Sequence, residues 1–290
     1  MTPDERKSVS PSPVGAPLRT RPFDSAESRL IDALFRGDGE AAVAQFAGEP
    51  DVDANIVGRS IGADQVRELA GRWPSVFGLE APVQVVFRER SAAGRLSFTE
   101  VQVEVAGPDG RAVLPVGVVG VFADDARAGG LERANVYFYE KVLNGSEAVR
   151  PPSYQHDAGE PLMTSAELGG VNAKYYAAVE AFDLEGVLRT FSEDMTVEVG
   201  TSVVRPDQVR RLYEQFIGDE VKLFFSSQID DGRGFVVEWA SGHLDPQASG
   251  VGIYVYDGEG RIKSIRMYDH FDPATVEGLR LEPIRLGAEQ

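Results

Sequence analysis

An acid and an imidazole stand side by side near the C-terminal end of the chain, in the stretch RMYDHFDP (residues 266–273). Asp269 and His270 stand at the end of the last predicted strand, and several of their neighbours are apolar. Carboxyl and imidazole groups are common proton-transfer groups in enzymes. Because side chains alternate between the two faces of a strand, Asp269 and His270 must point to opposite sides of the sheet. Which of them could serve a site depends on the elements that position them.

The composition of the chain excludes some classes of function. With 290 residues, the chain is long enough for two domains of ordinary size. A formal charge of −17 argues against a nucleic-acid or anionic-membrane partner, since both need a basic surface. Cysteine is absent, so no disulfide or thiolate site can form. The three histidines, His156, His243 and His270, are too scattered to predict a metal site, and we expect neither metal nor cofactor.

The first 24 residues are rich in proline, serine and charge, and they lack the apolar segment of a signal peptide. We predict a disordered leader over residues 1–24. No apolar run is long enough to span a bilayer. These features are typical of a cytoplasmic protein.

Segments of the first half recur in the second half in the same order. The segment GRSIGADQVRELAGRW (58–73) shares an Asp-Gln-Val-Arg run with GTSVVRPDQVRRLYEQF (200–216). Upstream, LFRGDGEAAVAQF (34–46) matches VEAFDLEGVLRTF (179–191) without a gap. Downstream, LERANVYFY falls on IKSIRMYDH, which aligns two tyrosines. Three matches in one order predict a duplicated domain.

The duplication sets the expected domain boundaries. The connecting stretch is rich in proline, glycine and polar residues, as an exposed linker would be. We predict a first domain over 25–142, a linker over 143–164, a second domain over 165–275 and a C-terminal tail over 276–290.

The second copy shows the order of elements most clearly. NAKYYAAVEAF has helical spacing, Asp183 is placed to cap a short second helix, and Pro206 opens a third helix that ends near Gly218. Four strand-like segments follow, separated by turn motifs. Helices followed by a four-strand meander predict an α+β fold, a cone-shaped curved antiparallel sheet with helices on its concave face. The space between them is the expected binding site.

The segment YYAAVEAFDLEGVLRTFSEDMTVEVG (175–200) resembles the start of a ketosteroid-isomerase or SnoaL-type polyketide cyclase domain. The segment GVGIYVYDGEGRIKSIRMYDHFDP (250–273) resembles its end, and the first copy resembles the family mainly through the second. The resemblance implies two tandem domains of the nuclear transport factor 2-like, or cystatin-like, fold. It leaves the reaction open, because isomerases, cyclases, dehydratases, epoxide hydrolases and plain binders share this fold.

The resemblance also places the family's catalytic groups on this sequence. The oxyanion-binding tyrosine falls on Tyr175, and it is kept. The general-base aspartate falls on Val199 and the second oxyanion donor on Gly252, so both are missing. We therefore reject steroid isomerisation by the family mechanism. Epoxide hydrolases of polyether biosynthesis resemble such tandem domains too, but their aspartate at the Val199 position is also absent here.

The family register implies which way the strand residues point. It turns Asp269 toward the cavity and His270 toward the outer face, and a shift of one residue would reverse this assignment. The other residues that it turns inward include His243, Trp239, Tyr254, Tyr256, Ile265, Met267 and Phe271. The residues that it turns outward include Arg266, Tyr137 and Tyr268, together with Glu100 and Glu238, which we expect to be solvated.

The first copy serves as an internal control for these polar residues. Its equivalent positions are apolar or glycine: Leu30 for Tyr175, Val105 for His243, Gly120 for Tyr254 and Phe138 for Asp269. A purely structural need for polar groups would be shared by both copies. The difference predicts a functional second domain and a degenerate, structural first domain. A core tyrosine and a solvated histidine are the alternative interpretations of Tyr175 and His243.

We therefore expect a cofactor-independent cyclase or isomerase of secondary metabolism, of the polyketide or antibiotic type, that acts by general acid–base chemistry on an apolar, carbonyl-bearing small molecule. Two alternatives remain, a non-catalytic ligand-binding or assembly module and a polyether-type epoxide hydrolase or cyclase. The copies are expected to form an intramolecular pseudo-dimer, in a monomer or a homodimer. The predicted catalytic residues are Asp269, His243 and Tyr175, and the predicted substrate-binding residues are Trp239, Tyr254, Tyr256, Met267, Phe271 and Val199.

Overall fold

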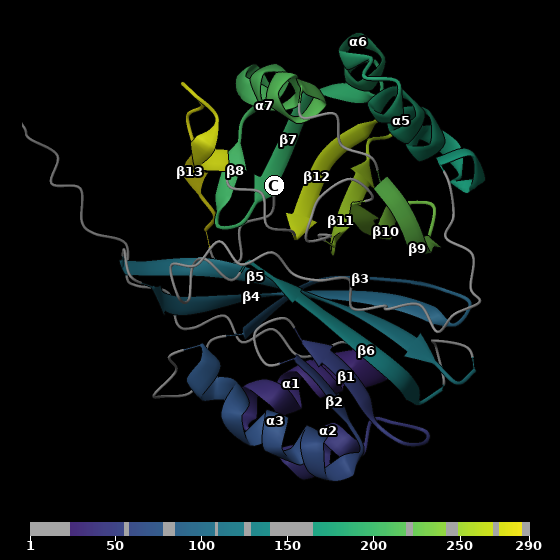
Figure 1. Ribbon diagram of the computed structural model, residues 1–290, viewed down its shortest axis with the longest axis vertical. Helices are drawn as coiled ribbons and strands as arrows, with labels where there is room; N and C mark the ends of the chain where they lie inside the picture. Colours follow the sequence, from purple (N-terminus) through teal and green to yellow (C-terminus); the bar gives the residue numbers. More distant parts are fainter. Residues whose placement is uncertain are drawn as a thin grey trace, which may run out of the picture.

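The computed structural model of the chain describes residues 24–54, 58–77, 85–107, 110–124, 129–139, 165–218, 223–241, 249–268 and 273–285. These residues form two sheets, each with its own set of helices (Figure 1). None of the described helices is long and apolar enough to cross a membrane.

The first half contains three helices and six strands among its described residues. Its elements are α1 (Ala26–Arg36), α2 (Gly39–Val43), β1 (Asp51–Ala54), β2 (Gly58–Ile61), α3 (Ala63–Val76), β3 (Val85–Ala93), β4 (Leu96–Gly107), β5 (Gly110–Phe122) and β6 (Leu131–Phe138).

The second half repeats this order and adds short elements at its ends. Its elements are the 3-10 helix η1 (Ser165–Glu167), α5 (Gly170–Glu180), α6 (Leu184–Leu188), β7 (Phe191–Val199), β8 (Ser202–Val204), α7 (Pro206–Gly218), β9 (Leu223–Asp230), β10 (Gly234–Ser241), β11 (Ser249–Tyr256), β12 (Ile262–Tyr268), the 3-10 helix η2 (Pro273–Thr275) and β13 (Glu282–Pro283).

Local capping explains where the helices begin and end. The side chain of Asp183 accepts a hydrogen bond from the amide of Gly186 at the start of α6, as predicted, and Asp38 caps α2 in the same way. Helix α7 runs from Pro206 to Gly218, again as predicted. Helix α1 ends at Gly37, which adopts the left-handed conformation that favours glycine.

Both sheets have the same strand order. It is β2-β1-β6-β5-β4-β3 in the first half and β8-β7-β12-β11-β10-β9 in the second, where β13 adds a further strand beside β8. The meander β9 to β12 is antiparallel, as predicted. The sheets are nevertheless mixed and not purely antiparallel, because β1 pairs in parallel with β6, and β7 with β12. The helix and meander between the paired strands supply the long crossover that a parallel pair requires.

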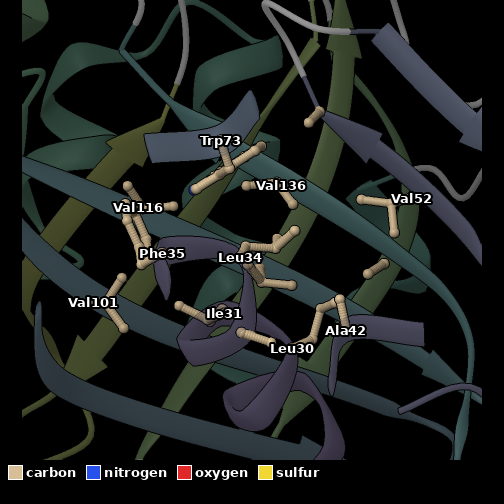
Figure 2. Packing of buried hydrophobic residues seen from close by; sticks show 14 of the residues in the cluster. Leu30, Ile31, Leu34, Phe35, Ala42, Val52, Trp73, Val101, Val116 and Val136 are labelled. Atoms are coloured by element: carbon tan, nitrogen blue, oxygen red, sulfur yellow. The ribbon is translucent and has the colours of Figure 1, made fainter. Parts of the chain in front are cut away.

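The helices cover the outer sides of the molecule, and the two sheets face each other between them (Figure 1). Each half has a core between its helices and the inner face of its own sheet. In the first half this core is aliphatic and aromatic, with Leu30, Leu34, Trp73 and Val116 packed between α1, α3 and the strands (Figure 2).

A third apolar cluster lies between the two sheets. It combines Phe98, Val119 and Tyr137 of the first half with Ile229, Val236, Val251, Ile253 and Tyr268 of the second half. Glu100 and Glu238, which we expected to be solvated, are only 0% and 2% exposed. That expectation was wrong because each outer sheet face is covered by the other half and not by water.

Candidate active site

The structure describes six of the nine residues that the sequence assigned to a site. Tyr175, Val199, Trp239, Tyr254, Tyr256 and Met267 all belong to the core of the second half or pack against it. Asp269, His243 and Phe271 lie outside the described residues, as does His270. The assignment of Asp269 as general acid or base, aided by His243, therefore stays a prediction.

The described part of β12 alternates as expected. Ile265 and Met267 face the inner core, whereas Tyr268 joins the cluster between the sheets. On β10, Val237 and Trp239 face the inner core and Val236 faces the other half. The register of these strands therefore places the predicted lining residues on one face.

Four tyrosine hydroxyls meet inside this core. Tyr175 and Tyr176 come from α5, Tyr213 from α7 and Tyr254 from β11, and all four are buried. The hydroxyl oxygens of Tyr175 and Tyr213 lie 2.9 Å apart, and the hydroxyls of Tyr176 and Tyr254 are hydrogen-bonded to each other. The rings of Tyr175 and Tyr254 are also in contact, with centroids 5.4 Å apart. We call these four residues the tyrosine cluster.

The tyrosine cluster has more hydroxyl protons than its hydrogen bonds use. Its four hydroxyls carry four protons, and the two hydrogen bonds within the pairs use two of them. A third contact, between Tyr175 and Tyr254, uses at most one more. At least one buried hydroxyl proton therefore has no acceptor among the described residues. A ligand that offers only an acceptor, such as a carbonyl oxygen or an oxyanion, would satisfy it.

Burial keeps these hydroxyls protonated. Desolvation raises the pKa of Tyr175 above its ordinary value, and hydrogen bonds with Tyr213 and Tyr254 offset part of that rise. Desolvation likewise raises the pKa values of Tyr176, Tyr213 and Tyr254, and the neighbouring tyrosines add to the rise. The tyrosine cluster is therefore a set of neutral hydrogen-bond donors at neutral pH.

Tyr254 fills the space that its neighbour Gly252 leaves open. A Cβ atom on Gly252 would lie 2.9 Å from both Cε2 and the hydroxyl oxygen of Tyr254. The hydroxyl of Tyr254 therefore occupies the place beside Gly252 to which the resemblance assigned a second oxyanion donor. In the first half the larger and the smaller residue exchange places. Val118 stands at the register position of Gly252, and Gly120 stands at that of Tyr254.

Three further residues, Asn172 of α5, Tyr256 of β11 and Trp239 of β10, belong to or contact the same half. The amide of Asn172 donates to the hydroxyl of Tyr256, and the Asn172 carbonyl oxygen has no hydrogen-bond partner among the described residues. Desolvation raises the pKa of Tyr256, and the nearby charge of Asp230 adds to that rise. Trp239 packs over Gly250, where a Cβ atom would be 2.5 Å from its ring.

The first half has no equivalent of the tyrosine cluster. The positions of Tyr175, Tyr176, Tyr213 and Tyr254 are taken there by Leu30, Ile31, Ala70 and Gly120. Sequence reasoning missed Tyr176, Tyr213 and Asn172. Tyr176 and Tyr213 stand opposite the apolar Ile31 and Ala70, whereas Asn172 stands opposite Glu27, which is polar as well, so the alignment carries a signal for the two tyrosines and not for Asn172.

Packing closes the equivalent region of the first half. The ring of Phe138, which stands at the position of Asp269, contacts Trp73 and Phe77, with centroids 6.2 and 5.2 Å apart. Phe35 contacts both of these rings as well. These aromatic rings therefore fill part of the inner core of the first half, whereas the inner core of the second half contains the tyrosine hydroxyl groups.

Neither half offers a metal site in its described part. Among the described residues, no group of three or more histidine, aspartate or glutamate side chains could hold a metal ion.

No protein-family model and no curated protein matches the chain. Among solved structures, it is similar to SalBIII, an epoxide hydrolase/cyclase-like enzyme linked to pyran-ring formation in the polyether salinomycin. The two are 24% identical, and the match covers 34% of this chain and 87% of that one, with a TM-score of 0.31. It is also similar to a hypothetical protein of ketosteroid isomerase-like fold from Catenulispora acidiphila, with 13% identity, 42% and 92% coverage and a TM-score of 0.35.

A nuclear transport factor 2-like protein of unknown function from Cytophaga hutchinsonii is a further similar structure. It is 13% identical, and the match covers 40% of this chain and 96% of that one, with a TM-score of 0.31. These matches cover less than half of this chain and most of the other protein. The strand order and helix positions described above show that the fold of this chain is α+β, with helices on a curved mixed sheet in each half.

Proposed function

We propose that the second half binds an apolar small molecule through a carbonyl oxygen and is a cofactor-independent cyclase or isomerase. The observation that carries this proposal is the hydroxyl proton of the tyrosine cluster that has no acceptor among the described residues and lies in an apolar core. Such a donor stabilises negative charge on oxygen far better than a solvated hydroxyl would, because no water competes with it. The apolar side chains around it favour an apolar ligand.

In this mechanism Tyr175 or Tyr254 donates to the oxygen on which negative charge develops. Asp269 moves the proton between carbon and oxygen as general acid or base, with His243 as its partner, and Trp239 and Met267 shape the substrate site together with Val199. Asp269 takes a proton from the carbon beside the carbonyl, which forms an enolate held by the tyrosine. Asp269 then returns the proton to another carbon of the enolate. In a cyclisation the enolate carbon instead attacks a second carbonyl carbon of the same molecule, the carbon–oxygen π bond opens, and Asp269 returns the proton to the resulting alkoxide oxygen.

A pair of matched ligands tests the binding step. 2-Acetylnaphthalene carries a carbonyl oxygen, and 2-ethylnaphthalene has a similar shape without it. We expect the ketone to bind more tightly by about 1 kcal/mol, the net value of a buried hydrogen bond, as measured by quenching of Trp239 fluorescence. Substitution of all four residues of the tyrosine cluster by Phe should remove this preference, because it leaves no hydroxyl donor in the cluster. Equal affinities in the parent protein would contradict the proposal.

A second experiment separates catalysis from binding. Asp269→Asn should abolish turnover of a ketone substrate while the preference for the carbonyl ligand remains. Retained turnover would remove Asp269 from the mechanism.

A non-catalytic ligand-binding module is the second candidate. The buried acids of the described second half, Glu198 and Glu238, both belong to the contact between the sheets and not to the inner core. Proton transfer in this proposal therefore depends on Asp269 alone among the acids considered. If Asp269→Asn changes only stability, the binding module becomes the better conclusion.

A further inference from the structure

The polar groups between the two sheets are arranged as two equivalent sites. Tyr137 of the first half donates to Oε1 of Glu238 at 2.5 Å, and Tyr268 of the second half donates to Oε1 of Glu100 at 2.5 Å. The two tyrosines occupy matching positions on β6 and β12, and the two glutamates occupy matching positions on β4 and β10. Each half therefore holds the last strand of the other half through one buried carboxylate.

The two sites differ in charge. Glu238 accepts from neutral donors, Asn135 at 2.8 Å, Tyr137 and Ser227 at 2.6 Å. Glu100 lies among cations, with Nε of Arg266 at 3.0 Å and Nη1 of Arg88 at 3.3 Å. The site around Glu100, which includes the two arginines, is the one that contacts the last strand of the second half.

Arg88 also contacts a second strand of the second half, β7. Its guanidinium also donates to both oxygens of Glu198 on β7, at 2.6 and 2.7 Å. A bidentate contact of this kind fixes direction as well as distance. Two residues of the first half, Glu100 and Arg88, thus hold the outer faces of β7 and β12.

The residues that Glu100 and Arg88 contact alternate along β7 and β12 with residues of the candidate active site. Glu198 precedes Val199 on β7, while Arg266 and Tyr268 flank Met267 on β12. Val199 and Met267 are direct register partners on the inner face. Because a pleated strand moves as one body, a shift of its outer side chains moves its inner side chains too. Tyr268 also directly precedes Asp269, the predicted acid or base.

We propose that Glu100, a residue of the first half, is a positioning residue for the candidate active site of the second half. It acts through Arg266 and Tyr268 and is supported by Arg88. The first half is then a working part of the site and not only a cover for the sheet. This inference rests on the proposed function for its effect on turnover, whereas its effect on structure can be measured without a substrate.

The chain contains two tryptophans, and each half holds one of them, Trp73 and Trp239. Trp239 packs over Gly250, next to the carbonyl oxygen of Tyr268, so its fluorescence reports on the end of β12. In a Trp73→Phe background, Glu100→Gln should shift the emission of Trp239 and raise its quenching by acrylamide. Glu132→Gln is the control, because it removes a carboxylate of the first half that pairs with Arg95 within that half, and it should leave the Trp239 signal at its parent value.

A second pair of variants covers the case in which Glu100→Gln does not fold. Tyr268→Phe removes the hydroxyl that donates to Glu100, whereas the control Ser60→Ala removes a hydroxyl from β2, at the edge of the first sheet. Only Tyr268→Phe should change the Trp239 signal. An unchanged Trp239 signal in both Glu100→Gln and Tyr268→Phe, or equal changes in the Ser60 and Glu132 variants, would overturn the proposal.

Turnover gives the remaining readout. In the full chain, Tyr268→Phe should lower kcat about tenfold with little change in KM, the size expected when a reacting group is displaced by a fraction of an ångström. Ser60→Ala should leave both constants unchanged. If Trp239 responds but the full chain turns over no ketone in any variant, the proposed function fails and the positioning inference stands. If turnover responds to Asp269→Asn but not to Tyr268→Phe, the positioning inference fails and the proposed function stands.

Discussion

At the scale of single residues, the second half differs from the first by an exchange of size between neighbours. Tyr254 and Gly252 share one face of β11, and the ring of Tyr254 covers the glycine. A side chain at position 252 would overlap the ring and hydroxyl of Tyr254 where they now lie, so the two cannot occur together. The lack of an acid at Gly252 is therefore a condition for placing the Tyr254 hydroxyl beside Tyr176, and not merely the loss of a family group.

Gly252→Ala tests this exchange. The added methyl group would lie 2.9 Å from the ring and hydroxyl of Tyr254, so Tyr254 must move and its bond with Tyr176 must break. We expect the free energy of unfolding to fall by about 1–3 kcal/mol, as for other overpacked cores, and the preference for a carbonyl ligand to disappear. Gly258→Ala is the matched control, because nothing lies within 4 Å of a Cβ atom there. Urea unfolding and ligand titration measure both effects, and equal results for the two variants would contradict the exchange.

At the scale of elements, the turn that follows β7 in the second half contacts the first half. Gly200 ends β7 in the left-handed conformation, with φ of 59°, and the equivalent Gly58 at the start of β2 has φ of 77°. A Cβ atom on Gly200 would lie 2.8 Å from Cδ1 of Tyr139 in the first half, whereas one on Gly58 would meet nothing within 4 Å. The same turn is therefore free in one half and covered in the other.

Substituting the two glycines separates backbone strain from this contact. Gly58→Ala should lower the free energy of unfolding by about 1 kcal/mol or slightly more, since only the left-handed backbone is penalised. Gly200→Ala should lower it by roughly 1–3 kcal/mol more, because the methyl group also meets Tyr139. Urea unfolding of both variants gives the difference. Equal losses would show that the Tyr139 ring moves aside at no cost.

Sequence reasoning reached the elements whose signals are local. Caps such as Asp183, the proline that opens α7 and the alternation along β12 depend on neighbours in the chain, and all three agree with the structure. The parallel pairing of β7 with β12 and the burial of Glu100 depend on partners far away in sequence, and these were missed. The tyrosine cluster lies between these cases. Tyr175 and Tyr254 were predicted from the sequence. Tyr213 differs from its partner Ala70 in the internal alignment, but its hydrogen bond with Tyr175 depends on the packing of residues far apart in the chain.

At the scale of the whole molecule, the two halves share a fold but divide the work. The inner face of the first half is filled by Trp73, Phe77 and Phe138, and that of the second half carries hydroxyl groups. Glu100 and Arg88 then connect the filled half to the strands of the other half. A filled core can serve as a rigid support because close-packed interiors transmit strain instead of absorbing it.

Phe138→Ala tests this division of work. Removing the ring leaves a cavity beside Trp73 and Phe77, so the free energy of unfolding should fall by roughly 3–5 kcal/mol. Turnover per folded molecule and the affinity for a carbonyl ligand should stay near the parent values, because Phe138 faces the core of the first half. Urea unfolding and active-site titration give the two numbers. A loss of turnover greater than the loss of folded protein would give the first half a site of its own.

Alkaline pH should act on the two halves differently. The buried core of the second half contains four tyrosines with raised pKa values, while the buried residues in the first-half core include no tyrosine among the described positions. In the unfolded chain these tyrosines ionise near their ordinary pKa of 10.0. Above that pH the unfolded state holds fewer protons than the folded state, so the free energy of unfolding falls as pH rises. Below pH 10 both states are protonated, and this contribution is fully present.

The slope of stability against pH measures how many tyrosines take part. Each one that ionises only on unfolding contributes about 1.4 kcal/mol per pH unit well above its unfolded pKa. Tyr213→Phe should therefore reduce the slope between pH 10.5 and 11.5 by about this amount, while the slope near pH 8 stays at zero in the parent and the variant alike. Urea unfolding followed by Trp239 fluorescence in the Trp73→Phe background gives the slope for the second half. A slope that Tyr213→Phe leaves unchanged would mean that Tyr213 ionises in the folded protein near its ordinary pKa, and its hydroxyl could not then be buried in the tyrosine cluster against Tyr175.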